Sequence, residues 1–398
     1  MGKRMGCWRA VACLGVALVA PGRLVGAEDK KPDAAPKIQV AILLDTSNSM
    51  DGLIHQARTQ LWKIVGEFTT IRLAGKTPKL EVALYEYGND GLNPKEGFLR
   101  LVVPFTPNLD KVSEAMFALR TNGGLEYCGK VVDAATKQLL WSDSAKDVKC
   151  IFIAGNEPFT QGDVDYVKAC KAAAAKGIAV NTIFCGPQEE GIRTNWQHGA
   201  QLADGSYMSI DQDQVVAAPS APQDKELTQL GVQPNATYLA YGDAKKRVEA
   251  AQRQAAQDAN AARSAAGAAA ARASFKASGL YRNADWDLVD AVQEGKVKLE
   301  SLKEDQLPEP IRNLSLDQKK SYIQKLADQR KLVQGQIAKA SQARKDYLAA
   351  QEKVLQAQMA ASAKSPGGAM AAKAAPALRA GTFERAVTDA VKAQAEKK

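Results

Sequence analysis

Several features that would assign this 398-residue chain to a common class of protein are scarce or missing. The apolar run at residues 10–20 is 11 residues long, which is too short to cross a bilayer. No block of five or more like charges occurs, and no aromatic-basic motif of an RNA-binding sheet is present. Composition therefore does not predict a nucleic-acid partner.

Motifs typical of metalloenzymes and hydrolases are missing as well. The sequence contains two histidines, His55 and His198, and no Cys-x-x-Cys pair, so a zinc site is not expected. There is no Ser/His/Asp, Cys/His, phosphate-loop or paired-carboxylate arrangement. We therefore expect a protein that is not an enzyme.

The N-terminus has the pattern of a secretory signal peptide. Basic residues precede the apolar run, and the small residues 25–27 follow it, which predicts a peptide over residues 1–27 that is cleaved after about Ala27. The mature protein would be secreted or periplasmic and would have no membrane span. Two alternatives stay open: an uncleaved anchor, and a lipoprotein signal, since residues 10–13 loosely resemble a lipobox.

Cleavage would lower the net charge from +9 to +5, because four basic residues leave with the signal. Four cysteines would remain in a compartment that permits disulfides: Cys128, Cys150, Cys170 and Cys185. A disulfide between Cys128 and Cys185 is one option, and buried free thiols are the other.

Composition divides the mature chain into segments. Residues 28–36 form a short charged tether, and residues 37–222 alternate apolar runs with helical patterns. Apolar, β-branched runs predict buried parallel strands at residues 38–44, 80–87, 150–154 and 178–184. Helices are expected between them, at residues 54–68, 109–119, 129–140 and 164–176. The predicted fold class is α/β, a doubly wound, mostly parallel open sheet with helices on both faces, whose functional groups gather at the carboxyl ends of the strands.

The rest of the chain is predicted to be all-α. Residues 223–314 include an Ala-rich helical stretch, and Ser315 and Gln318 form a capping box that starts a long helix over residues 315–363. Its apolar positions recur every three or four residues, but Arg330 and Arg344 interrupt the seam, so we expect a helical hairpin or an imperfect coiled coil. Residues 364–398 are expected to be a flexible tail with one short helix.

One loop contains a group of side chains that could bind a metal ion. At the carboxyl end of the first predicted strand, Asp45, Ser47 and Ser49 are spaced two residues apart and offer one carboxylate and two hydroxyls. Hard cations such as Mg²⁺ prefer oxygen ligands of this kind. The alternative is a plain cluster of helix N-cap residues, because Ser and Asp also favour that position.

This Asp-x-Ser-x-Ser loop, in its strand–helix setting, resembles the metal ion-dependent adhesion site of the von Willebrand factor A (VWA) family. The resemblance covers residues 37–213. It includes the short segments at residues 82–88 and 121–124 and a terminal strand at residues 205–210. More narrowly, the chain looks like a group of uncharacterised bacterial secreted proteins that carry this domain.

Two other loops depart from the family pattern. Glu126 stands where the family has a threonine ligand, and Gly155 stands where it has an aspartate. Since one carboxylate is lost and another gained, we infer that a ligand has moved and the site is retained. The alternative is that Glu126 caps the helix that starts near Tyr127 and the site is empty. Asn156 and Glu157 lie within reach as rim residues, directly or through water.

The resemblance implies an extracytoplasmic, adhesion-type protein-binding module. Asp45, Ser47, Ser49 and Glu126 would hold Mg²⁺, or Mn²⁺ or Ca²⁺, and an acidic side chain of a protein partner would complete the coordination. The rival hypothesis is a metal-free structural envelope or scaffold protein that forms homo-oligomers through its C-terminal helices.

Overall fold

The computed structural model describes residues 35–211, 220–264, 267–362 and 382–398. Residues 35–398 form one compact unit. The predicted signal peptide and most of the tether lie outside the described residues, and both stay predictions. We call residues 35–211 with 382–398 the sheet domain, and residues 220–362 the helical region.

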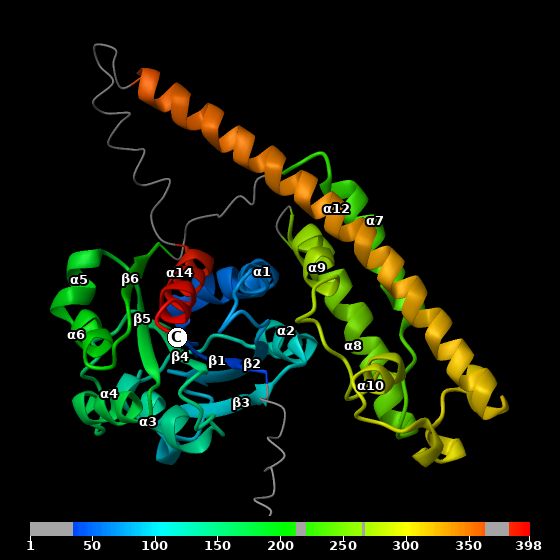
Figure 1. The fold of residues 1–398 in the computed structure, drawn as a ribbon. Helices are drawn as coiled ribbons and strands as arrows, with labels where there is room; N and C mark the ends of the chain where they lie inside the picture. Colours follow the sequence, from blue (N-terminus) through cyan, green and yellow to red (C-terminus); the bar gives the residue numbers. More distant parts are fainter. Residues whose placement is uncertain (1–34, 212–219, 265–266, 363–381) are drawn as a thin grey trace, which may run out of the picture. The chain divides into compact units, whose positions relative to one another are not determined.

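The sheet domain contains a six-stranded sheet in the order β3-β2-β1-β4-β5-β6 (Figure 1). All neighbouring strands are parallel except β2 and β3, which are antiparallel. The strands are β1 (Lys37–Asp45), β2 (Lys79–Tyr87), β3 (Leu99–Thr106), β4 (Val148–Gly155), β5 (Ala179–Cys185) and β6 (Tyr207–Ile210). The predicted mostly parallel open sheet is confirmed.

The central strands were predictable because they are buried on both faces. In β4 every residue is buried, and in β1 every residue after the first is buried. The edge strand β3 was not predicted, because only two of its eight residues are fully buried and it contains Pro104 and Arg100. An edge strand tolerates proline, because one of its sides needs no hydrogen-bond donor.

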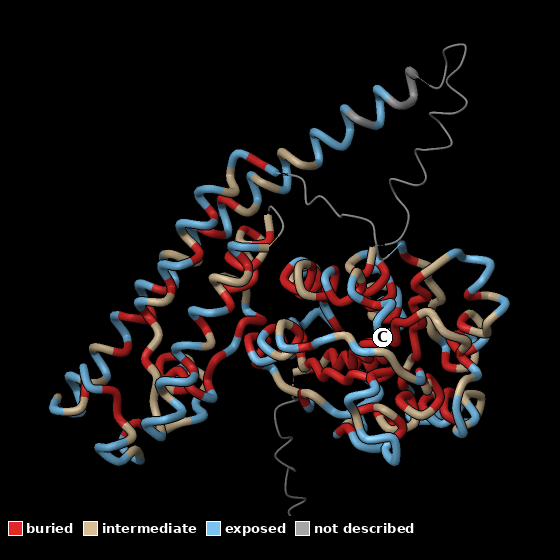
Figure 2. Tube along the Cα trace, turned by 180° about the vertical axis from the view of Figure 1, so that it is seen from behind, coloured by how far each residue is buried: buried red, intermediate tan, exposed pale blue. Residues whose placement is uncertain are grey.

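Helices cover both faces of the sheet (Figure 1). One apolar core lies between the sheet and the helices α1 (Asp51–Phe68), α2 (Leu109–Ala118) and α14 (Phe383–Ala395), and side chains of the helical region, such as Phe275, also belong to it. A second core lies on the opposite face, under α3 (Cys128–Gln138), α4 (Tyr166–Ala175) and α6 (Trp196–Gln201). The short helix α5 (Gln188–Arg193) leads into α6. Figure 2 shows the buried strands between these layers.

The last helix, α14, belongs to the sheet domain although it follows the helical region in sequence. Phe383, Val387 and Val391 are fully buried in the first core, and the amide of Phe383 donates to Gln56 of α1 at 3.2 Å. The short helix predicted near the C-terminus therefore forms, but as a packed element and not within a flexible tail. The rest of that predicted tail lies outside the described residues.

The helical region is all-α, as predicted. Its helices are α7 (Asp224–Val232), α8 (Ala244–Arg263), α9 (Ala268–Lys276), α10 (Leu288–Gln293), α11 (Glu309–Arg312) and α12 (Leu316–Ser362). The Ala-rich stretch forms two helices, because Gly267 adopts a left-handed conformation (φ 83°) at the start of α9.

The long helix α12 begins at the predicted capping box. Ser315 Oγ accepts from the Gln318 amide at 3.3 Å, and Gln318 Oε1 accepts from the Ser315 amide at 3.0 Å. The arginines that we expected to interrupt its seam instead attach it to the rest of the region. Arg330 pairs with Asp287 at 2.7 Å, and Arg344 pairs with Asp224 at 2.5 Å. The seam residues Ile323, Ile337 and Ala340 are buried within this chain, whereas Val354 is exposed. The ion pairs of Arg330 and Arg344 correct the interpretation of these two arginines as coiled-coil defects.

Candidate metal centre

The first loop places its oxygens together at the carboxyl end of β1. Asp45 Oδ1 accepts from the Ser47 amide at 2.7 Å, and the Ser47 and Ser49 hydroxyl oxygens are 3.1 Å apart. Ser47 is the N-cap residue of the 3₁₀ turn Asn48–Met50, yet its side chain makes no capping hydrogen bond. The alternative of a plain N-cap cluster is therefore not supported for Ser47.

Glu126 approaches the same place from the loop between α2 and α3. Its side chain is buried, with 3% exposed, and its amide donates to the Gln161 side chain. The N-cap residue of α3 is Tyr127, which has no side-chain capping bond. The hydrogen bonds of the Glu126 carboxyl group involve Asp45, Ser47 and the backbone of Glu157, none of which belongs to α3.

The carboxyl groups of Asp45 and Glu126 face each other. A Cβ atom added to Gly88 would lie 2.5 Å from Asp45 Oδ1 and 2.9 Å from Glu126 Cγ, so both groups border the same small space. Asp45 Oδ2 and Glu126 Oε2 are buried and have no hydrogen-bond partner. Because a buried oxygen without a partner is costly, these two atoms are suited to binding a ligand.

The electrostatics of the pair agree with this geometry. Burial raises the pKa of Asp45 well above its usual value, and the neighbouring Glu126 raises it further. Burial also raises the pKa of Glu126; Asp45 and Ser47 lower it through hydrogen bonding, and the charge of Glu157 raises it. Burial is thus the main cause of the raised pKa of both carboxyl groups.

The sheet leaves no room for a carboxylate at position 155. A Cβ atom on Gly155 would lie 2.5 Å from the Tyr87 hydroxyl oxygen and 3.1 Å from Asp45 Oδ2. The Tyr87 hydroxyl is fixed there, because it donates to the Ala154 carbonyl at 3.0 Å in a fully buried environment. The Tyr87 hydroxyl thus occupies the space that a side chain at position 155 would need.

The two predicted rim residues differ in their contacts. Asn156 Nδ2 donates to Ser49 Oγ at 3.2 Å, so Asn156 borders the hydroxyl side of the site. Glu157 is half-buried, and its backbone carbonyl accepts from Trp196 Nε1 at 2.8 Å. Glu157 contributes charge close to Glu126, and no hydrogen bond between the two carboxylates is present.

The sequence did not reveal the residues that shape the space around the carboxyl pair. Tyr87 and Gly88, which has a positive φ of 77°, stood out in the sequence only as part of the stretch at residues 82–88. Gln161 accepts the hydrogen bond of the Glu126 amide, but no sequence pattern pointed to this residue. The glycine before Asn89 was the one available hint of a tight turn.

The disulfide option for Cys128 and Cys185 is wrong in this structure. None of the four described cysteines is in a disulfide, and all four are buried. Cys128 belongs to the core on the α3 side of the sheet, whereas Cys185 belongs to the core on the α1 side. The sheet itself separates the two thiols, and the alternative of buried free thiols is confirmed.

The donor set fits a hard cation and does not fit a soft one. Within the described ranges, no three His, Cys, Asp or Glu residues form a group that could hold a metal ion. A cation here would be held by two carboxylates, Asp45 and Glu126, and by the hydroxyls of Ser47 and Ser49. Oxygen ligands completed by water are typical of Mg²⁺ and Ca²⁺ sites, and the two orphaned carboxyl oxygens leave room for such a role.

Solved structures with a similar fold include VWA domains. The conserved hypothetical protein BatB from Bacteroides thetaiotaomicron has 17% identity and a TM-score of 0.32; the match covers 44% of this chain and 90% of that one. The SpRpn10 VWA domain has 15% identity and a TM-score of 0.32, with 44% and 88% covered. Proximal thread matrix protein 1 from the mussel byssus, solved with a zinc-occupied MIDAS motif, has 10% identity and a TM-score of 0.32, with 46% and 43% covered.

No protein-family model matches the sequence, and no curated protein matches it. At these identities and TM-scores the structural similarity concerns the fold alone. Among the described residues, no helix is both long enough and apolar enough to cross a membrane. The sheet order and the Asp-x-Ser-x-Ser loop after β1 agree with the predicted fold, so the sheet domain is a VWA-like domain.

Proposed function

We propose that the sheet domain is an extracytoplasmic, non-enzymatic module that binds a protein partner through one divalent cation. Asp45, Ser47, Ser49 and Glu126 would hold the cation. The observation that carries this proposal is a pair of adjacent buried carboxyl groups, those of Asp45 and Glu126, in which Asp45 Oδ2 and Glu126 Oε2 have no hydrogen-bond partner. A cation there would supply the positive charge that the pair lacks.

The partner would reach the cation from the solvent side. Ser49, Asn48 and Leu125 are exposed beside the site, whereas Asp45 and Glu126 are buried beneath it. The cation would therefore be approachable from the side of the hydroxyl ligands, and an acidic side chain of the partner would complete its coordination. Leu125, 46% exposed, offers an apolar contact next to it.

Metal binding is the first test. Purified protein that has been shown to be metal-free is titrated with Mn²⁺ by calorimetry, and its melting temperature is followed in parallel. We expect one site per chain and a higher melting temperature, since a ligand that binds only the folded state stabilises it. Asp45→Asn and Glu126→Gln should each abolish both signals.

The matched control is Asp147→Asn. Asp147 is also a buried aspartate and accepts from the Lys37 amide at 2.8 Å, but it precedes β4 at the opposite edge of the sheet. This variant should lose stability and keep the Mn²⁺ response. No Mn²⁺ response in the unaltered protein, or an equal response in Glu126→Gln, would refute the proposal.

The rival function, assembly through the C-terminal helices, has one observation in its favour. Leu332 and Val354 on α12 are 64% and 52% exposed. If this helix mediates assembly, Leu332→Lys with Val354→Lys should convert an oligomer to a monomer in light scattering, and Asp45→Asn should not. A monomer already present in the unaltered protein would dismiss this function.

A further inference from the structure

A buried arginine of the helical region lies between the two helices that border the candidate metal centre. Arg272 of α9 is 2% exposed; its Nη1 is 2.6 Å from Asp110 Oδ1 of α2, and its guanidinium lies 4.3 Å from the ring centre of Trp62 in α1. One side chain thus contacts both helices. Its ion pair and its cation–π contact are both desolvated, which strengthens them.

These two helices are directly connected to the site. The helix α1 begins at Asp51, just after the loop that carries Ser47 and Ser49. The helix α2 ends at Ala118, and residues 119–127 then lead to Glu126. The position of the hydroxyls relative to the Glu126 carboxylate therefore depends on how α1 and α2 are placed against each other.

Close to the site, further hydrogen bonds join α1 and the loop before it to α2 and to residues 119–127. Arg58 of α1 donates to the carbonyls of Met116 at 2.8 Å and Leu119 at 2.5 Å. Thr121 Oγ1 donates to Asp51 Oδ1 at 2.6 Å, and the Asn122 amide donates to the Thr46 carbonyl at 3.0 Å. Movement of α2 would thus be transmitted to both loops.

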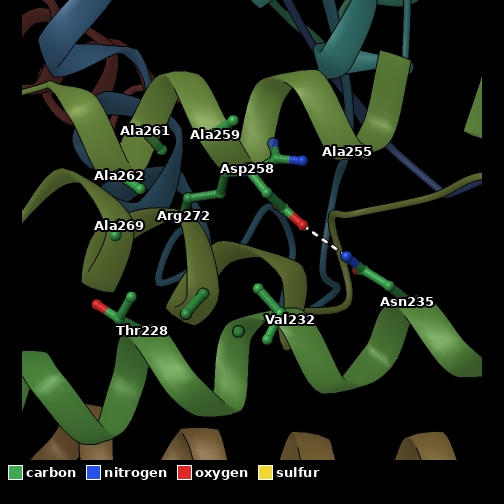
Figure 3. A pocket seen from close by; sticks show the side chains of 12 residues that line it. Thr228, Val232, Asn235, Ala255, Asp258, Ala259, Ala261, Ala262, Ala269 and Arg272 are labelled. Carbon is green, nitrogen blue, oxygen red and sulfur yellow. Dashed lines mark hydrogen bonds and ion pairs between the residues drawn. The ribbon is translucent and has the colours of Figure 1, made fainter. Parts of the chain in front are cut away.

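Arg272 also belongs to a network of hydrogen bonds and ion pairs within the helical region. Its Nε donates to Asp258, and Asp258 also accepts from Asn235 at 2.7 Å and from the buried Lys276 at 3.1 Å. Figure 3 shows Arg272 and Asp258 on the wall of an alanine-lined pocket between α7, α8 and α9, with Asn235 facing Asp258. The guanidinium cannot shift without disturbing this network.

Other contacts join the same surfaces, so Arg272 lies at the centre of a specific attachment. Tyr281 donates to Asp110 Oδ2 at 2.7 Å, and Ser113 donates to Gln257 at 2.7 Å. A set of buried ions is an expensive way to attach two helical surfaces, because apolar side chains of similar volume attach them equally well. What such a network adds is a defined geometry.

We propose that Arg272 is a positioning residue: by fixing α1 against α2, it sets the spacing between Ser47, Ser49 and Glu126. The helical region thereby controls how tightly the sheet domain binds its cation. This inference rests on the proposed metal-binding function, but its structural half, the coupling between Arg272 and residues 119–127, is measurable without any metal.

The test uses the double variant Arg272→Met with Asp110→Asn, which removes the ion pair without leaving Asp110 as an unpaired buried charge. Hydrogen exchange is measured by mass spectrometry on the metal-free full chain, and Mn²⁺ affinity is measured by calorimetry. We expect exchange in residues 119–127 to become about tenfold faster, and the Kd for Mn²⁺ to rise by about tenfold.

The matched control is Arg330→Met, which breaks another buried ion pair of the helical region. The partners of Arg330 are Asp287, Asp290 and Thr237, all within that region. It should lower the melting temperature and leave exchange in residues 119–127 and the Mn²⁺ affinity unchanged.

The outcomes separate the two proposals. Unchanged exchange in residues 119–127 of the double variant would overturn the coupling, whatever the metal result. Faster exchange with unchanged Mn²⁺ affinity would overturn control of the site. If the unaltered protein binds no Mn²⁺, the proposed function fails, and control of cation binding fails with it. Exchange would then still decide whether Arg272 positions the loop.

Discussion

In the helical region, the buried cation Arg330 lies between the carboxylates of Asp287 and Asp290, at 2.7 and 2.6 Å. At the carboxyl edge of the sheet, Asp45 and Glu126 are equally buried, and each leaves one oxygen without a partner. The first arrangement is complete within the chain, whereas the second lacks a positive charge. Burial alone does not distinguish a structural charge from a functional one; the completeness of its partners does.

Removing Arg330 from its cluster with Asp287 and Asp290 should have the largest effect on stability. Arg330→Met leaves Asp287, which is fully buried, and Asp290 without their partner, so we expect a loss of about 3–5 kcal/mol in the free energy of unfolding. Urea denaturation measures it. Lys320→Met is the control, because its pair with Glu300 is exposed to solvent and should contribute little to the free energy of unfolding. Equal losses in the two variants would contradict the comparison.

The second-largest effect on stability is expected when the space beside the Asp45–Glu126 pair is filled. Gly155→Ala places a methyl group against the Tyr87 hydroxyl, which should cost about 1–3 kcal/mol. Adding Tyr87→Phe removes that hydroxyl and should restore part of the loss. Gly335→Ala in α12 is the matched control, since no atom lies within 4 Å of its added methyl group, and alanine in a helix should stabilise by up to about 1 kcal/mol.

Removing one charge from the Asp45–Glu126 pair should change the free energy of unfolding in the opposite direction to Arg330→Met. In metal-free protein at neutral pH, Glu126→Gln removes one of two adjacent buried carboxylates. The free energy of unfolding should therefore rise. A clear loss of stability would mean that the Glu126 carboxylate is satisfied in the metal-free protein, against the comparison above.

The smallest effect concerns pH. Because the pKa values of Asp45 and Glu126 are raised in the folded state, the protonated forms are favoured there. The stability that the pair contributes is present below the pKa of an unfolded carboxyl group, about 4, and is lost as pH rises through the folded pKa values. Thermal denaturation of metal-free protein across pH 4–8, with Asp45→Asn/Glu126→Gln as reference, should show this decline. A flat difference between the two proteins would contradict it.

The sequence was sufficient where the signal is local. Continuous apolar runs predicted β1, β2, β4 and β5, and the spacing of Asp45, Ser47 and Ser49 predicted a shared loop. The edge strand β3 was missed because a half-exposed strand containing Pro104 lacks such a run.

Long-range information was missing elsewhere. The helix α14 has an amphipathic sequence, but nothing in it identifies α1, more than 300 residues away, as its partner. Arg330 looked like a defect in a seam because Asp287 and Asp290 reach it from a distant part of the chain. Likewise, Glu126 was identified by its position in a loop, whereas the role of Tyr87 in excluding a side chain at Gly155 required coordinates.

The position of α14 has a consequence for how the chain can be divided. Since Phe383, Val387 and Val391 complete the core above α1, a fragment that stops at residue 211 lacks part of its own interior. The helical region is thus an insertion whose two ends return to one domain. A synthetic peptide of residues 382–398, added to residues 35–211, should restore cooperative unfolding by complementation. The minimal independent folding unit would then be two separate stretches of sequence.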